Sequence, residues 1–165
     1  MNIYEYAMQM ELDGEKYYRE MADKSSSPGL KKIFSLLADE EVKHYRVVEQ
    51  LSRQTDTPQM AETSILDDVK NVFASMKDVE QDLHVGTTEE TQDYRKARDI
   101  EEKSVRFYQD MAEQEQKGPQ HSIFLQLEDQ EKKHLRIMEN IVEFISKPEP
   151  GNWLENAEWH HLDKY

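Results

Sequence analysis

Apolar residues recur every three or four positions in four long stretches, which cover about residues 3–22, 28–53, 89–116 and 119–146. This period predicts amphipathic α-helices. Only short polar or Gly-Pro breaks separate the members of each pair, so they form antiparallel hairpins. A long connection, residues 54–88, joins the pairs and makes the second and third helices parallel. The pattern predicts an all-α four-helix bundle.

Local signals mark several helix ends. Asn2 and Glu5 have the spacing of a capping box, and Ser27 precedes a proline suited to the first turn. Ser64 is the expected cap of a short crossover helix that extends to about Val79, with Gly86 beyond its end. The chain thus has helix-start signals where its apolar period begins.

The chain also repeats itself at an offset of 90 residues. Residues 10–22 align with residues 100–112, and residues 37–44 align with residues 127–134. One offset serves both pairs of segments, so the domain is predicted to be a duplicated helical hairpin.

Each long helix interrupts its inward-facing apolar stripe with a glutamate, and two helices add a histidine three residues later. These residues are Glu11, Glu41, His44, Glu101, Glu131 and His134. Four buried carboxylates at one level repel one another strongly, and no Lys or Arg faces them on the stripes. Two divalent cations would balance the four charges, and Glu-x-x-His from two helices with one Glu from each of the others is the di-iron pattern of such bundles. The alternative is a metal-free bundle whose core carboxylates are satisfied by the protein.

Composition narrows the function classes. The formal charge of -14 disfavours nucleic-acid binding, and the absence of cysteine excludes disulfides, thiolate metal sites and cysteine nucleophiles. The mean hydropathy of -0.96 makes folding marginal by composition alone, and the helical period is what favours a folded bundle over disorder. The lack of an apolar run near 18 residues and of a signal-peptide core leads us to expect a cytoplasmic protein without a membrane span.

The first helix has the pattern Glu-x-x-Gly-x-x-Tyr-Tyr, the third has the pattern Glu-x-x-Ser-x-x-Phe-Tyr, and the chain adds the two Glu-x-x-His motifs. In these motifs the chain resembles the ferritin-like superfamily and, within that superfamily, the rubrerythrin-type di-iron domain. The resemblance implies a ferritin-like bundle with two metal ions per chain, Fe/Fe with Fe/Zn or Mn as alternatives. It implies that Glu41 and Glu131 bridge the ions, that Glu11 and Glu101 are terminal ligands, and that His44 and His134 each bind one ion. Tyr18 and Tyr108 resemble the tyrosines that hydrogen-bond to ligand carboxylates in this family.

Two departures from the family pattern affect function. Rubrerythrins proper carry a rubredoxin module with four cysteines, so this chain is expected to need a separate electron donor. Many also carry an extra carboxylate where this chain has Ser104, whose repeat mate is Gly14. The resemblance implies reduction of hydrogen peroxide or O₂ by Fe(II), as a peroxidase or ferroxidase in oxidative-stress defence. A metal-binding protein for buffering, storage or sensing of iron, manganese or zinc is the alternative, and a metal-free interaction module is the third reading.

The predicted domain organisation is one bundle over residues 1–147, with repeats at about 3–53 and 89–146 and the crossover between them. Residues 148–165 form a tryptophan-bearing tail expected to pack on the bundle or on the partner in a homodimer. The tail pair Glu158 and His161 lacks a repeat mate and is not expected to bind metal. Three glutamates that flank the ligands are expected on solvated faces: Glu40, Glu102 and Glu128. Three histidines have no ligand partner at helical spacing and are not expected to bind metal: His84, His121 and His160.

Overall fold

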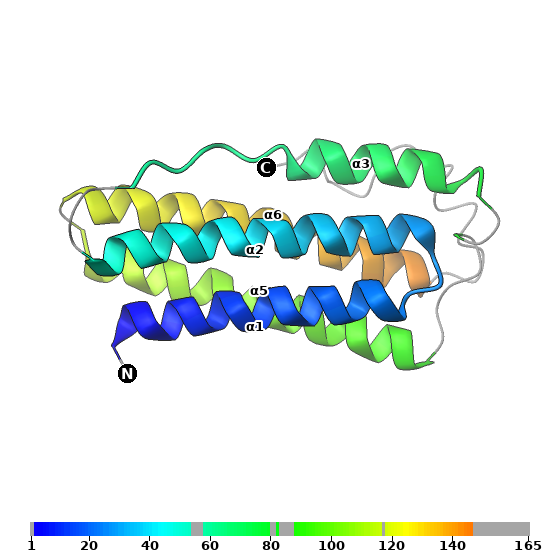
Figure 1. Cartoon of the computed structure of the whole chain (residues 1–165), viewed down its shortest axis with the longest axis horizontal. Coiled ribbons are helices and arrows are strands. Elements are labelled where there is room, and N and C mark those ends of the chain that lie inside the picture. The colour runs from blue at the N-terminus through cyan, green and yellow to red at the C-terminus, as the bar shows by residue number, and fades with distance from the viewer. Residues whose placement is uncertain (1, 54–57, 80–81, 83–87, 117, 147–165) are drawn as a thin grey trace.

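The computed structural model describes residues 2–53, 58–79, 82, 88–116 and 118–146, and these residues form five α-helices and no strand. The helices are α1 (Ile3–Lys24), α2 (Pro28–Arg53), α3 (Ile65–Met76), α5 (Thr88–Gln114) and α6 (Pro119–Ile145). The four long helices lie side by side, and α3 packs against α2 and α6 (Figure 1). The predicted all-α bundle with a short crossover helix is confirmed.

Two hairpins make up the bundle, because α1 packs chiefly on α2 and α5 chiefly on α6. In Figure 1 the colours show that α2 and α5 run in the same direction, from right to left. The crossover therefore returns the chain along the length of the bundle, as the long connection predicts. The result is two similar hairpins that face each other.

The expected caps are largely present. The Asn2 side chain accepts a hydrogen bond from the amide of Glu5 at 2.9 Å, and the Glu5 carboxylate accepts one from the amide of Asn2 at 3.3 Å. Ser27 Oγ accepts from the amide of Leu30 at 3.1 Å. Ser64 occupies the N-cap position of α3, but its hydroxyl donates to Asp68 and makes no cap bond. Gly86 lies outside the described residues.

The apolar interior falls into two clusters at opposite ends of the bundle. One surrounds the α1–α2 turn and includes Phe34, Leu37 and Ile141. The other lies toward the opposite end and includes Val48, Tyr108 and Phe124. The predicted inward stripes are buried throughout, so the glutamates and histidines at mid-length lie between two water-excluding layers.

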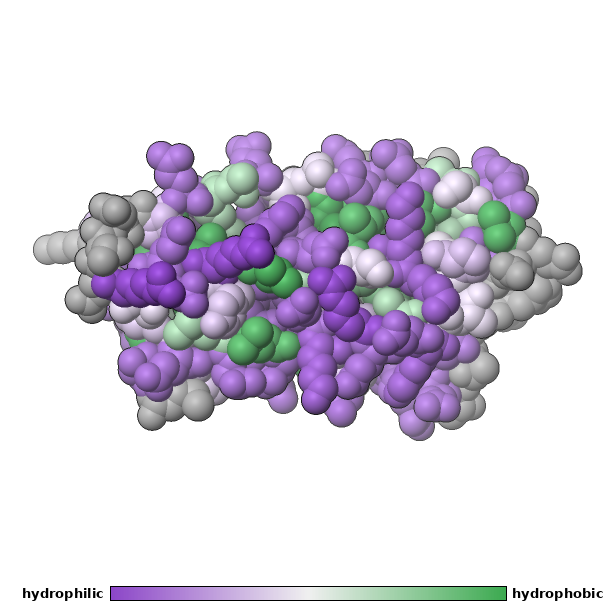
Figure 2. Space-filling view, in the orientation of Figure 1, coloured by the Kyte–Doolittle hydropathy of each residue, from purple (hydrophilic) through white to green (hydrophobic). Residues whose placement is uncertain are grey.

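Hydrophilic side chains cover most of the face drawn in Figure 2, with small separate hydrophobic groups among them. None of the described helices is long and apolar enough to cross a membrane. The tail, residues 148–165, lies outside the described residues, and so do His84, Glu158, His160 and His161.

Candidate metal centre

The structure brings the six predicted side chains together at the middle of the bundle, and each is at most 4 % exposed. They come from α1 (Glu11), α2 (Glu41 and His44), α5 (Glu101) and α6 (Glu131 and His134). Short distances connect the helices: His44 Nδ1 lies 2.8 Å from Glu131 Oε1, and His134 Nδ1 lies 3.3 Å from Glu41 Oε1. The six residues form one polar layer.

Within this layer, two groups of four residues each offer ligand atoms that lie within 4.8 Å of one another. One group is Glu11, Glu41, His44 and Glu131; the other is Glu41, Glu101, Glu131 and His134. Glu41 and Glu131 belong to both groups. This sharing gives two adjacent positions for cations, with two carboxylates between them.

The layer is electrostatically stressed without cations. Burial, and then the neighbouring carboxylates, raise the pKa of Glu41 and of Glu101 well above the usual glutamate range. Burial alone would lower the pKa of His44, but the charges of Glu11 and Glu131 raise it well above its usual value. Two carboxylates about 4 Å apart repel by about 4 kcal/mol at an effective dielectric constant of about 20. Cations between them would remove this cost.

Unused polar atoms provide a direct test of fit. Glu11 Oε2, Glu101 Oε2 and Glu131 Oε2 are buried and have no hydrogen-bond partner among the described residues. Neither ring nitrogen of His134 has one. Buried polar atoms are nearly always paired, so these atoms require an explanation. Carboxylate oxygens and imidazole nitrogens are iron, manganese and zinc ligands, and the donor set fits such ions.

Two tyrosines reach this layer across the bundle. The Tyr108 hydroxyl on α5 donates to Glu11 Oε1 on α1 at 2.6 Å, and the Tyr18 hydroxyl on α1 donates to Glu101 Oε1 on α5. Both tyrosines are buried. Each therefore fixes one carboxylate oxygen, and the second oxygen of the same group has no hydrogen-bond partner among the described residues.

Gln130, which the sequence analysis did not single out, orients one of the histidines. Its amide nitrogen donates to the carbonyl of Ala61 at 3.0 Å, and its Oε1 lies 2.8 Å from His44 Nε2. A backbone carbonyl only accepts, so the amide oxygen must face His44, and His44 Nε2 must carry the hydrogen. His44 Nδ1 faces Glu11 and Glu131, whose negative charges favour a proton on it. When that proton leaves, the lone pair of Nδ1 can bind a cation.

Glu40 is the repeat mate of Gln130, and its predicted place on a solvated face is wrong. Its side chain is buried, accepts a hydrogen bond from the Thr63 hydroxyl and lies 3.5 Å from Lys43 Nζ. The segment before α3 covers this part of α2 and α6, which explains the burial of both Glu40 and Gln130. The offset of 90 residues was the signal that could have paired them.

Glu128 is also buried, with Lys132 Nζ 3.5 Å from its carboxylate, so its predicted exposure is wrong too. Glu102 is exposed as predicted. His121 Nδ1 lies 2.8 Å from the carbonyl of Ala112 at the α5–α6 turn. Glu128, Glu102 and His121 are in neither of the two ligand groups and are therefore not part of the polar layer.

Ser104 stands where the family that the sequence resembles often has an extra carboxylate, and Gly14 is its repeat mate. A Cβ atom at Gly14 would lie 3.2 Å from Glu41 Oε2, which is tighter than ordinary contact. Ser104 Oγ donates to the carbonyl of Ile100 at 3.2 Å and not to the cluster. Both half-sites therefore lack a seventh carboxylate at this position.

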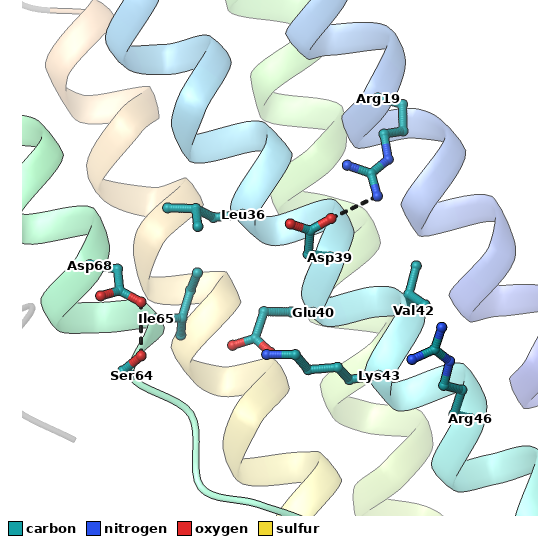
Figure 3. A pocket seen from close by; sticks show the side chains of 10 residues that line it. All are labelled: Arg19, Leu36, Asp39, Glu40, Val42, Lys43, Arg46, Ser64, Ile65 and Asp68. Atoms are coloured by element: carbon teal, nitrogen blue, oxygen red, sulfur yellow. Dashed lines mark hydrogen bonds and ion pairs between the residues drawn. The ribbon is translucent and has the colours of Figure 1, made fainter.

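A surface pocket beside α2 and α3 is separate from this layer (Figure 3). Its lining includes Glu40 and Lys43 and the ion pair of Arg19 with Asp39, but none of the six clustered residues. In Figure 3 the Glu40 carboxylate and the Lys43 ammonium lie side by side on α2. The pocket is therefore a surface feature beside α2 and α3 and is not part of the layer.

Comparison with known proteins agrees with this geometry. The family model of rubrerythrin matches residues 2–142, a span that contains the six clustered residues and both tyrosines. Searches of curated proteins and of solved structures gave no match. Because the family match covers most of its 165 residues, the chain belongs to the rubrerythrin family, whose members carry a di-iron carboxylate centre.

Proposed function

We propose that this protein is a di-iron oxidoreductase that reduces hydrogen peroxide or O₂ with electrons from Fe(II). The observation that carries the proposal is the pair of overlapping ligand groups with Glu41 and Glu131 in common. A metal-free structural core gains nothing from four buried carboxylates, three of which have an oxygen without a hydrogen-bond partner among the described residues. The metal-free reading is therefore disfavoured.

The proposed ligand set follows from the two groups. Glu41 and Glu131 would help to hold both ions. Glu11 and His44 complete one position, and Glu101 and His134 complete the other. Four carboxylates balance two divalent ions, so the loaded layer is close to neutral. A neutral cluster is far less costly than four bare charges between two apolar layers.

When bound, two ferrous ions would supply the two electrons that, together with two protons, convert one peroxide molecule to two waters. The chain's own residues hold and shield that chemistry. Tyr18 and Tyr108 fix Glu101 and Glu11 by hydrogen bonds and keep one oxygen of each group directed to its cation. The apolar clusters on both sides exclude bulk water, which strengthens every electrostatic contact in the layer.

The electrons must enter from outside this chain. Its 165 residues contain no cysteine and so cannot form a rubredoxin-type iron site. We infer a separate electron donor for repeated turnover. Fe/Fe is the proposed metal pair, and Fe/Zn or Mn remain the competing assignments for the same ligands.

The test is anaerobic loading with Fe(II) followed by peroxide titration. We expect two iron ions per chain and one peroxide consumed per two Fe(II) oxidised. Glu101→Gln should reduce iron binding and peroxide consumption, whereas Glu102→Gln, the exposed neighbour on the same helix, should change neither. Equal behaviour of the two variants would refute the ligand assignment. Full metal loading without peroxide consumption would instead favour the alternative, a protein that stores, buffers or senses metal.

A further inference from the structure

A line of aromatic rings connects the polar layer with the surface. It begins at Tyr108, whose hydroxyl donates to Glu11 Oε1 at 2.6 Å. The Phe107 ring meets the Tyr108 ring edge-on, with centroids 5.3 Å apart. The Tyr6 ring on α1 lies 5.1 Å from Phe107, centroid to centroid, and Tyr6 is 54 % exposed. Three rings thus span the distance from a proposed iron ligand to solvent.

The outer end of this line is chemically distinct from its repeat mate. At the offset of 90 residues, Tyr6 corresponds to Lys96 and Phe107 corresponds to Tyr17. There the Lys96 ammonium lies 5.7 Å from the centroid of the Tyr17 ring, and the Tyr17 hydroxyl donates to the carbonyl of Asp93 at 2.8 Å. An ammonium group cannot be oxidised as a phenol can. Only one of the two equivalent places therefore ends in an exposed phenol.

Tyr6 also stands apart from the other tyrosines. Tyr6 is the one exposed tyrosine in the part of the chain that the structure describes, since the others there are buried or half-buried. It lines a mostly apolar groove between α1 and α5, together with Met10, Tyr17 and Ile100. A small phenol can approach Tyr6 in this groove. Both the route inward and the access from outside meet at this residue.

We propose that Tyr108, Phe107 and Tyr6 form an electron path from the surface to the metal centre, and that Tyr6 is its oxidisable outer end. This inference rests on the proposed function. Aromatic rings in contact shorten the gaps across which an electron must tunnel. Tyrosine at each end can give up an electron, and Phe107 bridges the two.

The step balances with hydrogen peroxide as the oxidant. When peroxide exceeds the electrons held at the centre, each peroxide takes up two electrons and two protons and becomes two waters. Tyr6 loses one electron inward, and its phenolic proton passes to solvent. A dissolved phenol or a second Tyr6 supplies the other electron and proton. The two phenoxyl radicals then couple through a new carbon–carbon bond to give a dityrosine.

The test treats the iron-loaded full-length protein with excess peroxide in the presence of N-acetyltyrosine. Dityrosine fluorescence and peptide mass mapping measure the adduct, and peroxide consumption is recorded in the same samples. We expect the adduct at Tyr6, its loss in Tyr6→Phe, and its loss in Phe107→Leu with the fold retained by circular dichroism. Tyr45→Phe, at a half-buried tyrosine on α2 that does not line this groove, should leave the Tyr6 adduct unchanged.

The possible results separate the inference from the proposed function. Peroxide consumption without an adduct at Tyr6 overturns the electron path alone. An undiminished Tyr6 adduct in Phe107→Leu also overturns it, because oxidants from solution would then be responsible. Absence of peroxide consumption in the wild-type protein overturns the proposed function and the path together.

Discussion

Gln130 provides a sharp test of how the protein prepares its metal centre. Its amide links the carbonyl of Ala61 to His44 Nε2, with both contacts between 2.8 and 3.0 Å. Gln130→Ala removes the acceptor of the imidazole hydrogen, so neither the tautomer nor the ring angle of His44 is fixed any longer. We expect the metal affinity of the position that includes His44 to fall, because the partner that orients this proposed ligand has been removed.

The size of this effect follows from two observations. Loss of an outer partner of a metal-binding histidine typically lowers metal affinity by about 10- to 100-fold, or about 1.4–2.7 kcal/mol. His44 is fully buried, so water cannot replace the lost acceptor without opening the core. An unsatisfied buried polar group costs about 1–3 kcal/mol of stability. Ala61 is exposed, so its carbonyl can bond to water and adds little to this cost.

The assay is a competition titration of the metal-free protein with Fe(II) or Zn(II) against a chromophoric chelator. It should resolve two binding steps in Gln130→Ala, one near the wild-type affinity and one weaker by about 10- to 100-fold. Glu40→Gln is the matched control. Glu40 lies at the equivalent place in the other repeat, but it makes no hydrogen bond to His134, whose Nε2 has no partner among the described residues, so Glu40 does not orient that ring.

Three results would refute the reasoning. Equal weakening of both steps in Gln130→Ala would mean that the substitution disturbs the bundle as a whole. Unchanged affinity would mean that the Glu131 and Glu11 contacts alone fix the His44 ring. A comparable loss in Glu40→Gln would show that burial next to a bridging glutamate matters, and not the hydrogen bond to histidine.

Four further predictions concern the metal layer and the bundle. Burial and then neighbouring carboxylates raise the pKa of Glu41 and Glu101, so metal ions must displace protons from these groups. Calorimetry of metal binding in buffers of different ionisation enthalpy should detect the released protons, and metal affinity should fall as the pH is lowered. The same raised pKa values mean that the metal-free fold binds more protons than the unfolded chain, so its thermal stability should fall as pH rises above the ordinary glutamate range, and a rise would contradict this. Gly14→Val should lower metal affinity by displacing Glu41, whereas Ser104→Val at the repeat mate should not, as measured by the same chelator titration. Asn2→Ala should cost about 1 kcal/mol of unfolding free energy in urea, and no change would mean that the first turn of α1 frays in the native protein.

Much of the fold could be predicted because the sequence repeats a simple physical pattern. Leu37 and Val48 stand on the same stripe as Glu41 and His44, and a helix of 3.6 residues per turn places all four on one face. The stripe had to be buried for the chain to fold at such low mean hydropathy. The carboxylates on the stripe therefore had to be buried too, and convergence of the four helices follows from that.

The outer contacts of the centre could not be predicted in the same way. Gln130 and Glu40 lie beside the stripe, where periodicity indicates a partly solvated position. Their burial depends on the segment that precedes α3, because Ala61 and Thr63 contact them. No local period places an irregular segment over two helices. Such contacts depend on tertiary structure and appear only with coordinates.

The hydrogen-bond partners of Tyr18 and Tyr108 also depend on tertiary structure. Tyr18 lies two turns after Glu11 on the same helix, yet it donates to Glu101 on α5. Tyr108 makes the reciprocal bond to Glu11. The pairing depends on the offset of α1 against α5, which is set by how the two hairpins face each other. Sequence spacing predicts that a tyrosine is near the layer, but not which carboxylate it holds.

The two halves of the centre are equivalent in their proposed ligands but not in their support, and this difference predicts the order of filling. Gln130 fixes the tautomer of His44, whereas neither ring nitrogen of His134 has a hydrogen-bond partner in the part of the chain that the structure describes. An oriented ligand loses less rotational freedom when a cation binds, so the first ion should occupy the position that includes His44. Substoichiometric Co(II) should therefore shift the NMR signals of His44 before those of His134. Simultaneous shifts would show that the bridging glutamates, and not the histidines, decide where the first ion binds.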